Sequence, residues 1–349
     1  MSRIVKRACG AALGICLALS GCQAGYVLRQ GWGQITYRSH EVPIESPALR
    51  DLAGGEAAEK LKWVPEILEF ARTELGLEPG DSYSTYVDTR GSPVSYVVTA
   101  AHPLALVPYQ WQFPFAGRVP YKGHFDEADA NAEAEKLKQR GYETLVFPVM
   151  AFSTLGWFQD PVVSSMVEGT LADLVDVILH ETTHRTVYYP GLASFNESLA
   201  TWVAREGTVR FLKAHDELRP LLEGYLGEQR ASAEREALLL RLRDDLDALY
   251  RSGLDEPSIL ERKAEIFASA SLALETLRGA PSEPPLNPTN AYVLSTARYH
   301  ELEKPLGIAQ RKLGGHPRAL VAWLQGLDAG ADPLEAVLQL AWSGGAGAE

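Results

Sequence analysis

The chain has 349 residues, of which 46% are hydrophobic and 22% are charged, and its mean hydropathy is −0.11. This composition is typical of a folded globular protein and excludes the disordered and fibrous classes. The 33 basic and 45 acidic residues give a net charge of −12. A nucleic-acid partner is not expected, because phosphate binding needs a basic stripe and the sequence shows none.

The first residues have the character of a bacterial lipoprotein signal. Three basic residues precede a short apolar run at 11–19, which is too short to span a bilayer stably. The following Leu-Ser-Gly-Cys, which ends at Cys22, resembles a lipobox, a signal that is cut before the cysteine, which is then lipidated. We therefore expect a signal peptide over residues 1–21 and a lipid on Cys22. An ordinary secretory signal is the alternative interpretation.

The rest of the chain is expected to lie in the bacterial envelope. Cys22 would be the only cysteine of the mature chain and would carry the lipid, so no internal disulfide can form. By resemblance to enterobacterial lipoprotein sorting, Gln23 after the cysteine implies the outer membrane, with the protein facing the periplasm. Residues 22–45 lack periodicity and are interpreted as a tether that packs onto the body of the protein.

A β-rich region follows the tether. Apolar residues at spacings of three and four predict a helix over 61–75, with Pro65 as a break or a first-turn position. Short runs between glycines and prolines predict strands at 83–87, 94–99 and 144–152, and an alanine-rich stretch predicts a helix at 127–139. Because Pro148 cannot donate a hydrogen bond to a neighbouring strand, the last strand should be an edge strand or a bulged one.

Beyond about residue 165 the pattern is helical. Leucines between 239 and 249 mark a long helix, and apolar positions between 266 and 277 mark its antiparallel partner across Ser252 and Gly253. A proline-rich connector at 281–288 should precede two or three further helices. The predicted fold class is α+β, with a small N-terminal mixed β-sheet region and a predominantly helical C-terminal half. Whether these are one body or two lobes stays open.

The most informative stretch contains His180, Glu181 and His184 in the pattern HExxH. Two histidines four positions apart lie on one face of a helix, so both imidazoles can ligate one ion. The glutamate beside the first histidine can contact the water on that ion without being a ligand. These are the mechanics of a zinc peptidase, with the histidines as ligands and Glu181 as the base.

The sequence around this motif supplies a helix and a third ligand. Thr170 and Asp173 form a capping box at the expected helix start, and the leucine-rich side of that helix lies opposite the two histidines. After a turn at Gly191 a second helix opens with Asn-Glu-Ser-Leu-Ala, in which Glu197 lies thirteen positions after His184. Two packed helices would bring this carboxylate to the imidazoles, completing the ligand set of a catalytic site for one Zn²⁺ ion.

Plainer interpretations exist for each of these residues. The histidine pair could be solvated or satisfied in the core, and the two glutamates could be surface charges. Structural zinc is disfavoured, because the chain has no cysteine after residue 22. The remaining histidines are scattered and are interpreted as ordinary surface or core residues: His102, His124, His215, His300 and His316.

The pairing of HExxH with a downstream NExxA resembles the gluzincin metallopeptidases. More closely, the chain resembles the bacterial putative aminopeptidase family of lipid-anchored proteins. The resemblance is carried by the two metal motifs and by residues 26–34, 111–123 and 151–161, with a weaker match at 290–299. The resemblance implies a zincin-like catalytic region at 46–215 and a helical region at 216–349 that completes the active-site cleft.

The resemblance also implies residue roles in peptide-bond hydrolysis. His180, His184 and Glu197 would be zinc ligands, and Glu181 would be the base and proton shuttle. Gluzincins commonly stabilise the oxyanion with a tyrosine or histidine from a later helix, for which Tyr299 is the candidate and Tyr188 the second choice. The glycine-rich GxMEN motif that holds the substrate's amine is absent, and Thr201 replaces an aspartate that supports a zinc histidine in thermolysin-like enzymes.

Two rival functions stay open at this point. One is a catalytically inactive envelope lipoprotein that keeps the zincin fold as a binding or assembly module, although an intact Glu181 argues against it. The other is an amidase that acts on cell-wall peptides with the same chemistry.

Overall fold

Three small sheets build the β part of the computed structural model, which describes residues 40–113, 117–149, 159–278, 288–328 and 330–343. In the first sheet β2 (Thr85–Val87) pairs antiparallel with β1 (Val42–Pro43) and parallel with β8 (Val162–Val163). The second sheet is antiparallel, with β3 (Ser95–Ala101) between β6 (Tyr121–His124) and β7 (Glu143–Val149). The third is a hairpin of β4 (Trp111–Phe113) and β5 (Gly117–Val119). The predicted signal peptide and Cys22 lie outside the described residues.

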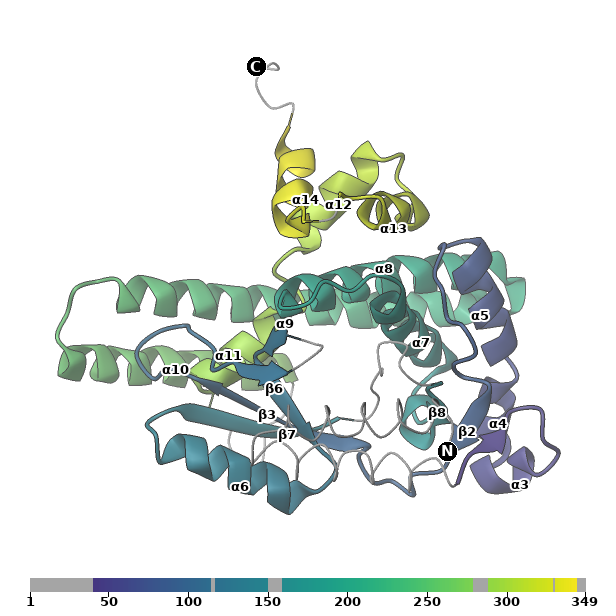
Figure 1. Cartoon of the computed structure of the whole chain (residues 1–349), viewed down its shortest axis with the longest axis horizontal. Coiled ribbons are helices and arrows are strands. Elements are labelled where there is room, and N and C mark those ends of the chain that lie inside the picture. The colour runs from purple at the N-terminus through teal and green to yellow at the C-terminus, as the bar shows by residue number, and fades with distance from the viewer. Residues whose placement is uncertain (1–39, 114–116, 150–158, 279–287, 329, 344–349) are drawn as a thin grey trace, which may run out of the picture.

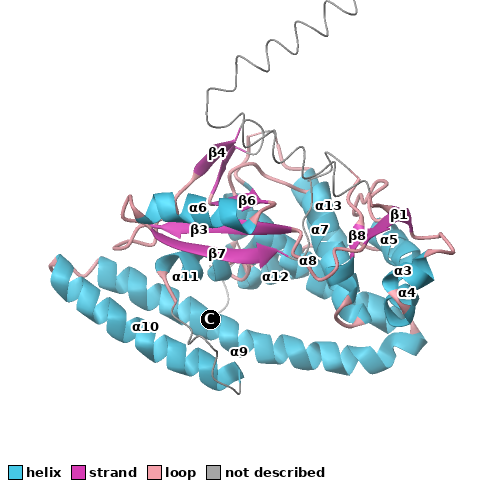
Figure 2. Ribbon diagram, turned by 90° about the horizontal axis from the view of Figure 1, so that it is seen from below, coloured by secondary structure: helices cyan, strands magenta, loops and turns pink. Residues whose placement is uncertain are grey.

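The second sheet has helices on both faces. Helix α6 (Glu127–Lys138) covers one face, and α11 (Asn290–Ala297) lies against the other (Figures 1 and 2). Buried apolar side chains of β3 and α6 pack against each other between the sheet and α6. Strand β7 pairs with β3 alone within the sheet, and Pro148 stands opposite Tyr96. The prediction of an edge strand at Pro148 is confirmed. Proline has no amide hydrogen to donate, and an edge strand has one side on which no donor is needed.

The expected helix over 61–75 corresponds to α5 (Val64–Thr73), and Leu61 is the last residue of a separate helix, α4 (Gly55–Leu61), which follows α3 (Leu49–Ala53). Pro65 lies in the first turn of α5. Amide groups of the first turn have no partner within the helix, so the missing amide hydrogen of proline costs no helical hydrogen bond. The apolar periodicity continues across the break at 62–63 because both helices bury side chains in the same core.

The helical half begins with α7 (Leu171–Thr186) and α8 (Ala193–Ala214). The predicted antiparallel pair is confirmed as α9 (Arg219–Tyr250) and α10 (Glu256–Arg278), which lie side by side in Figures 1 and 2. After the connector the described residues contain four helices, two of them short, instead of two or three: α11, α12 (Glu303–Lys312), α13 (Pro317–Gln325) and α14 (Pro333–Trp342). Among the helices that the structure describes, none has the length and apolar character required to cross a membrane.

One hydrophobic core joins the beginning and the end of the described chain. It contains Ile67 of α5, Leu174 of α7, Leu199 of α8 and Leu306 of α12, all fully buried. A smaller cluster lies between α6 and the sheet, and a third joins α9, α10 and α11. Because the largest core draws on both the β-rich part and the helical part, the two parts share one hydrophobic interior. The predicted α+β fold class is confirmed.

Candidate metal centre

Helix α7 carries three of the predicted site residues and has a well-defined start. The Thr170 amide donates to Asp173 Oδ2 at 2.7 Å, and the Asp173 amide donates to Thr170 Oγ1 at 3.2 Å, so the predicted capping box is present. The two threonines between the histidines, Thr182 and Thr183, are buried, and their hydroxyls donate to carbonyls of the preceding turn. The buried surface of α7 therefore extends past the leucine-rich side that the sequence indicated.

The two histidines of α7 converge on one carboxylate oxygen of α8. His180 Nε2 lies 3.5 Å from Glu197 Oε2, and His184 Nε2 lies 3.4 Å from the same atom. The imidazole rings are 4.8 Å apart and nearly perpendicular. All three side chains are mostly shielded from solvent, with 16%, 9% and 12% of their surface exposed. The structure thus brings together the three residues that the sequence proposed as ligands.

The loop between α7 and α8 is held by the first residue of the second motif. Asn196 accepts a hydrogen bond from the Tyr189 amide at 3.0 Å and donates one to the Tyr189 carbonyl at 2.9 Å. Gly191 adopts a φ of 85°, a conformation that glycine reaches without strain. The Asn196 amide therefore closes the turn that places Glu197 opposite the histidines, which gives this asparagine a structural role.

Close packing of the two helices fixes their separation. Gly207 of α8 lies against Leu75, just after α5, and against Leu179 of α7: an added Cβ would come 2.7 Å from Leu75 Cδ1 and 2.8 Å from Leu179 Cδ1. Ala200, the last residue of the NExxA pattern, is fully buried. Small residues at these positions allow α8 to approach α7 closely enough for the carboxylate to reach both rings.

The two glutamates of the site have opposite electrostatic environments. Burial opposes ionisation of Glu197, but the two histidine rings outweigh it and hold the pKa of this carboxyl well below its usual range. Burial raises the pKa of Glu181 to about 7, although the neighbouring His180 ring favours the charged form. Glu197 is therefore suited to stay charged as a ligand, and Glu181 is suited to accept and release a proton near neutral pH.

The donor set fits a metal ion. The two Nε2–Oε2 separations are longer than good hydrogen bonds of 2.7–3.2 Å, as expected for atoms arranged around a common centre. Neutral imidazole nitrogens and one carboxylate oxygen are the protein ligands of catalytic zinc sites, which keep a further position for water. His184 Nδ1 is buried and has no hydrogen-bond partner among the described residues.

Tyrosine hydroxyls gather around the same carboxylate. Tyr299 follows α11 in a turn rather than lying inside a helix, and its ring centroid is 6.4 Å from that of His180. Burial, and after it the nearby Glu197 carboxylate, raises the pKa of the Tyr299 hydroxyl well above its usual value. The same two causes raise the pKa of Tyr188. Both predicted tyrosines therefore carry their protons at neutral pH and lie near Glu197.

Two further residues near the site were missed by the sequence analysis. Tyr121 of β6 has its pKa raised by burial and then by Glu197, so its hydroxyl belongs to the same group. Asp160 is buried, and its charge helps to raise the pKa of Glu181. Both lie in stretches that carry the family resemblance, which is the only sequence signal that could have pointed to them.

A polar cavity of about 400 Å³ opens beside His180. It is lined by side chains of α7, α8 and α9 and by the turn after α11, including Asp176, Arg205, Tyr299 and His300. Thr201, which stands at the position of an aspartate in thermolysin-like enzymes, also lines it. Of the candidate ligands and the candidate base, His180 alone is in its lining, so the cavity lies to one side of the candidate metal centre.

One comparison with known proteins found a match. The model of a family described as putative aminopeptidases matches residues 25–332, which is most of the chain and includes every described site residue. No curated protein and no solved structure matches the chain. The chain belongs to the putative aminopeptidase family.

Proposed function

We propose that the protein is a zinc-dependent peptidase that hydrolyses peptide bonds in the bacterial envelope. The observation that carries the proposal is the convergence of His180, His184 and Glu197 on one point, with Glu181 following His180 in the chain. Membership of a family named for aminopeptidase activity supports peptides as the substrate class. A free N-terminus of the substrate is the expected preference.

The chain's own residues divide the chemistry among them. His180, His184 and Glu197 would hold a zinc ion, which would supply a Lewis acid for hydrolysis of the peptide bond. Glu181 would accept a proton from the attacking water and pass it to the leaving amine. Tyr299 keeps its proton and can donate a hydrogen bond to the substrate oxygen on which negative charge develops.

Zinc binding by these residues is the first expected result. Protein lacking residues 1–22 should bind about one zinc ion per chain after purification without added metal, as a single catalytic site requires. The His180→Ala, His184→Ala double variant should lose that zinc, while a His102→Ala, His316→Ala double variant should keep it. Metal analysis by mass spectrometry is the measurement, and full occupancy of the first double variant would exclude these histidines as ligands.

Peptide cleavage tests the activity itself. Zinc-loaded protein should be incubated with a peptide library in which each sequence is present with a free and with an acetylated N-terminus. Cleavage restricted to the free N-terminus supports an aminopeptidase, and cleavage of both forms supports an endopeptidase. Zinc bound at full occupancy without cleavage of any peptide would contradict the proposed activity.

The envelope location rests on the N-terminal signal and has its own test. Cys22 is proposed as the lipidated residue that anchors the protein in the outer membrane, facing the periplasm. Cys22→Ser should leave the precursor uncleaved and without lipid, because serine lacks the thiol that accepts the lipid. Mass spectrometry of the N-terminal peptide checks this, and a mature N-terminus other than a modified Cys22 in the unaltered protein would refute it.

A further inference from the structure

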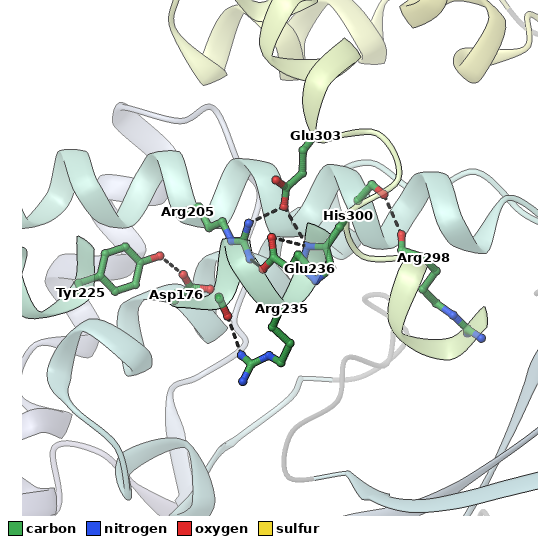
Figure 3. A network of polar contacts seen from close by, with 10 residues as sticks. Asp176, Arg205, Tyr225, Arg235, Glu236, Arg298, His300 and Glu303 are labelled. Atoms are coloured by element: carbon green, nitrogen blue, oxygen red, sulfur yellow. Dashed lines mark hydrogen bonds and ion pairs between the residues drawn. The ribbon is translucent and has the colours of Figure 1, made fainter. Parts of the chain in front are cut away.

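A cluster of charged side chains includes His300, the residue after Tyr299. Arg205, two turns after Glu197 on α8, pairs with Glu236 of α9 through Nη2 and Oε1 at 2.6 Å and with Glu303 of α12 through Nη1 (Figure 3). The three side chains are partly buried, with 22%, 10% and 28% of their surface exposed. One guanidinium therefore ties together three helices that are distant in the sequence.

His300 connects this cluster to the candidate metal centre. Its Nδ1 lies 2.9 Å from Glu303 Oε1 and 3.4 Å from Glu236 Oε2. The two carboxylates and the imidazole could in principle hold a metal ion, since their ligand atoms lie within 4.8 Å of one another. Arg205, however, already supplies the cation that bridges the carboxylates. The arrangement is thus an ion-pair cluster whose histidine is the residue immediately after Tyr299.

The other neighbour of Tyr299 is held from the same helix. Ser198, which directly follows Glu197 and is fully buried, donates its hydroxyl to the Arg298 carbonyl at 2.7 Å. Tyr299 therefore stands between two fixed residues, one bound by Ser198 and one bound by the charged cluster. Both connections start on α8, the helix that supplies Glu197. Tyr299, Arg205 and His300 also line the cavity beside His180.

We infer that Arg205, Glu236, His300 and Glu303 act with Ser198 to position Tyr299 beside the candidate ligands. Arg205 and His300 are positioning residues in this arrangement, and Tyr299 is the residue that contacts substrate. Removing Arg205 leaves two partly buried carboxylates without their shared cation, so they must move apart or take in water. The turn that holds Tyr299 then loses one of its two attachments. This inference rests on the proposed peptidase function for its effect on rate.

The activity test is a double-mutant cycle between Arg205 and Tyr299. Tyr299→Phe should lower kcat about 100-fold or more, as loss of a donor to a developing oxyanion does. Arg205→Met should lower kcat roughly 10- to 100-fold with little change in KM, since small displacements of a catalytic group are costly. In the Tyr299→Phe background the Arg205→Met change should have no further effect. Additive losses would overturn the inference, because Arg205 would then act independently of Tyr299.

Two further variants separate positioning from general destabilisation. Arg210→Met is the matched control, because Arg210 is also a partly buried arginine of α8 and pairs with Glu206 and the Gly315 carbonyl, outside the site. It should leave kcat unchanged. Glu303→Gln keeps the shape of the cluster and serves if Arg205→Met does not fold. It should lower kcat in the same direction, and an unchanged kcat in this folded variant would overturn the inference.

A measurement without turnover keeps this inference distinct from the proposed function. The protein is labelled with 3-fluorotyrosine, and the ¹⁹F resonance of Tyr299 is assigned by its loss in Tyr299→Phe. Arg205→Met should shift and broaden that resonance, and Arg210→Met should not. A shifted resonance without peptide cleavage would refute the peptidase proposal alone. An unchanged resonance in folded Arg205→Met would refute the positioning role, whatever the activity.

Discussion

Glu181→Gln is expected to keep its zinc and its fold and to lose a factor of roughly 100 to 10,000 in turnover, the usual contribution of a general base. Glutamine preserves the shape and the hydrogen-bonding capacity of the side chain but cannot take a proton from water. The measurement is zinc content beside the rate of peptide cleavage, with circular dichroism to show that the variant is folded. Full activity on a peptide that the unaltered protein cleaves would exclude Glu181 as the base.

The same substitution should also change how the stability of the metal-free protein depends on pH, because burial of the charged carboxylate costs free energy. The pKa of Glu181 in the metal-free fold is about 7, above the ordinary value of 4.5. The native state therefore binds the proton more tightly than the unfolded state, and stability falls as pH rises from about 4.5 through 7. Metal-free Glu181→Gln should thus melt at a higher temperature than the unaltered protein at pH 8 and at an equal temperature near pH 4. A pH-independent difference in Tm would contradict the burial of this charge.

Glu197→Gln should weaken zinc binding first and lower turnover as a consequence. A neutral amide replaces the carboxylate that faces both histidine rings, so zinc affinity should fall by more than the 10- to 100-fold typical of an outer-shell partner. Turnover measured at saturating zinc should recover in part, in contrast to Glu181→Gln. Competition with a chromophoric chelator gives the affinity.

The matched control for this variant is Glu206→Gln on the same helix. Glu206 pairs with Arg210 and accepts a hydrogen bond from Gln310, away from the metal centre. Zinc affinity should be unchanged in this control. If Glu197→Gln binds zinc as tightly as the unaltered protein and still loses activity, Glu197 contributes to the chemistry in some way other than as a ligand.

Local patterns predicted that the candidate ligands would meet, because these residues lie close together in the chain. The spacing of His180 and His184 places both rings on one side of α7, and the capping box fixes where that helix starts. Glu197 follows after a loop short enough that α8 must pack beside α7. Each of these steps depends on contacts between neighbours in the sequence, which periodicity and capping rules describe well.

The surroundings of the centre could not be predicted in this way. Tyr121 lies within the electrostatic influence of Glu197 because β6 pairs with β3 in a sheet whose register the sequence does not fix. Arg205 meets Glu236 and Glu303 across three helices, and nothing in the local pattern of any one helix indicates the other two. Leu61, the last residue of α4, was assigned to the next helix for a related reason: apolar spacing reports which side chains face the core, and both helices face the same one.

The short distance along the chain between His184 and Glu197 has a consequence for the order of assembly. All three candidate ligands lie on one helical hairpin, α7 and α8, so the loop that must close to bring them together is small and closes at little entropic cost. Tyr299 enters about a hundred positions later, after α9 and α10 have folded back along each other. Under the proposed function, a partly folded chain could therefore bind zinc before Tyr299 joins the site. Metal uptake and catalytic competence would then be separate steps, because Tyr299 reaches the site only when the later helices have packed.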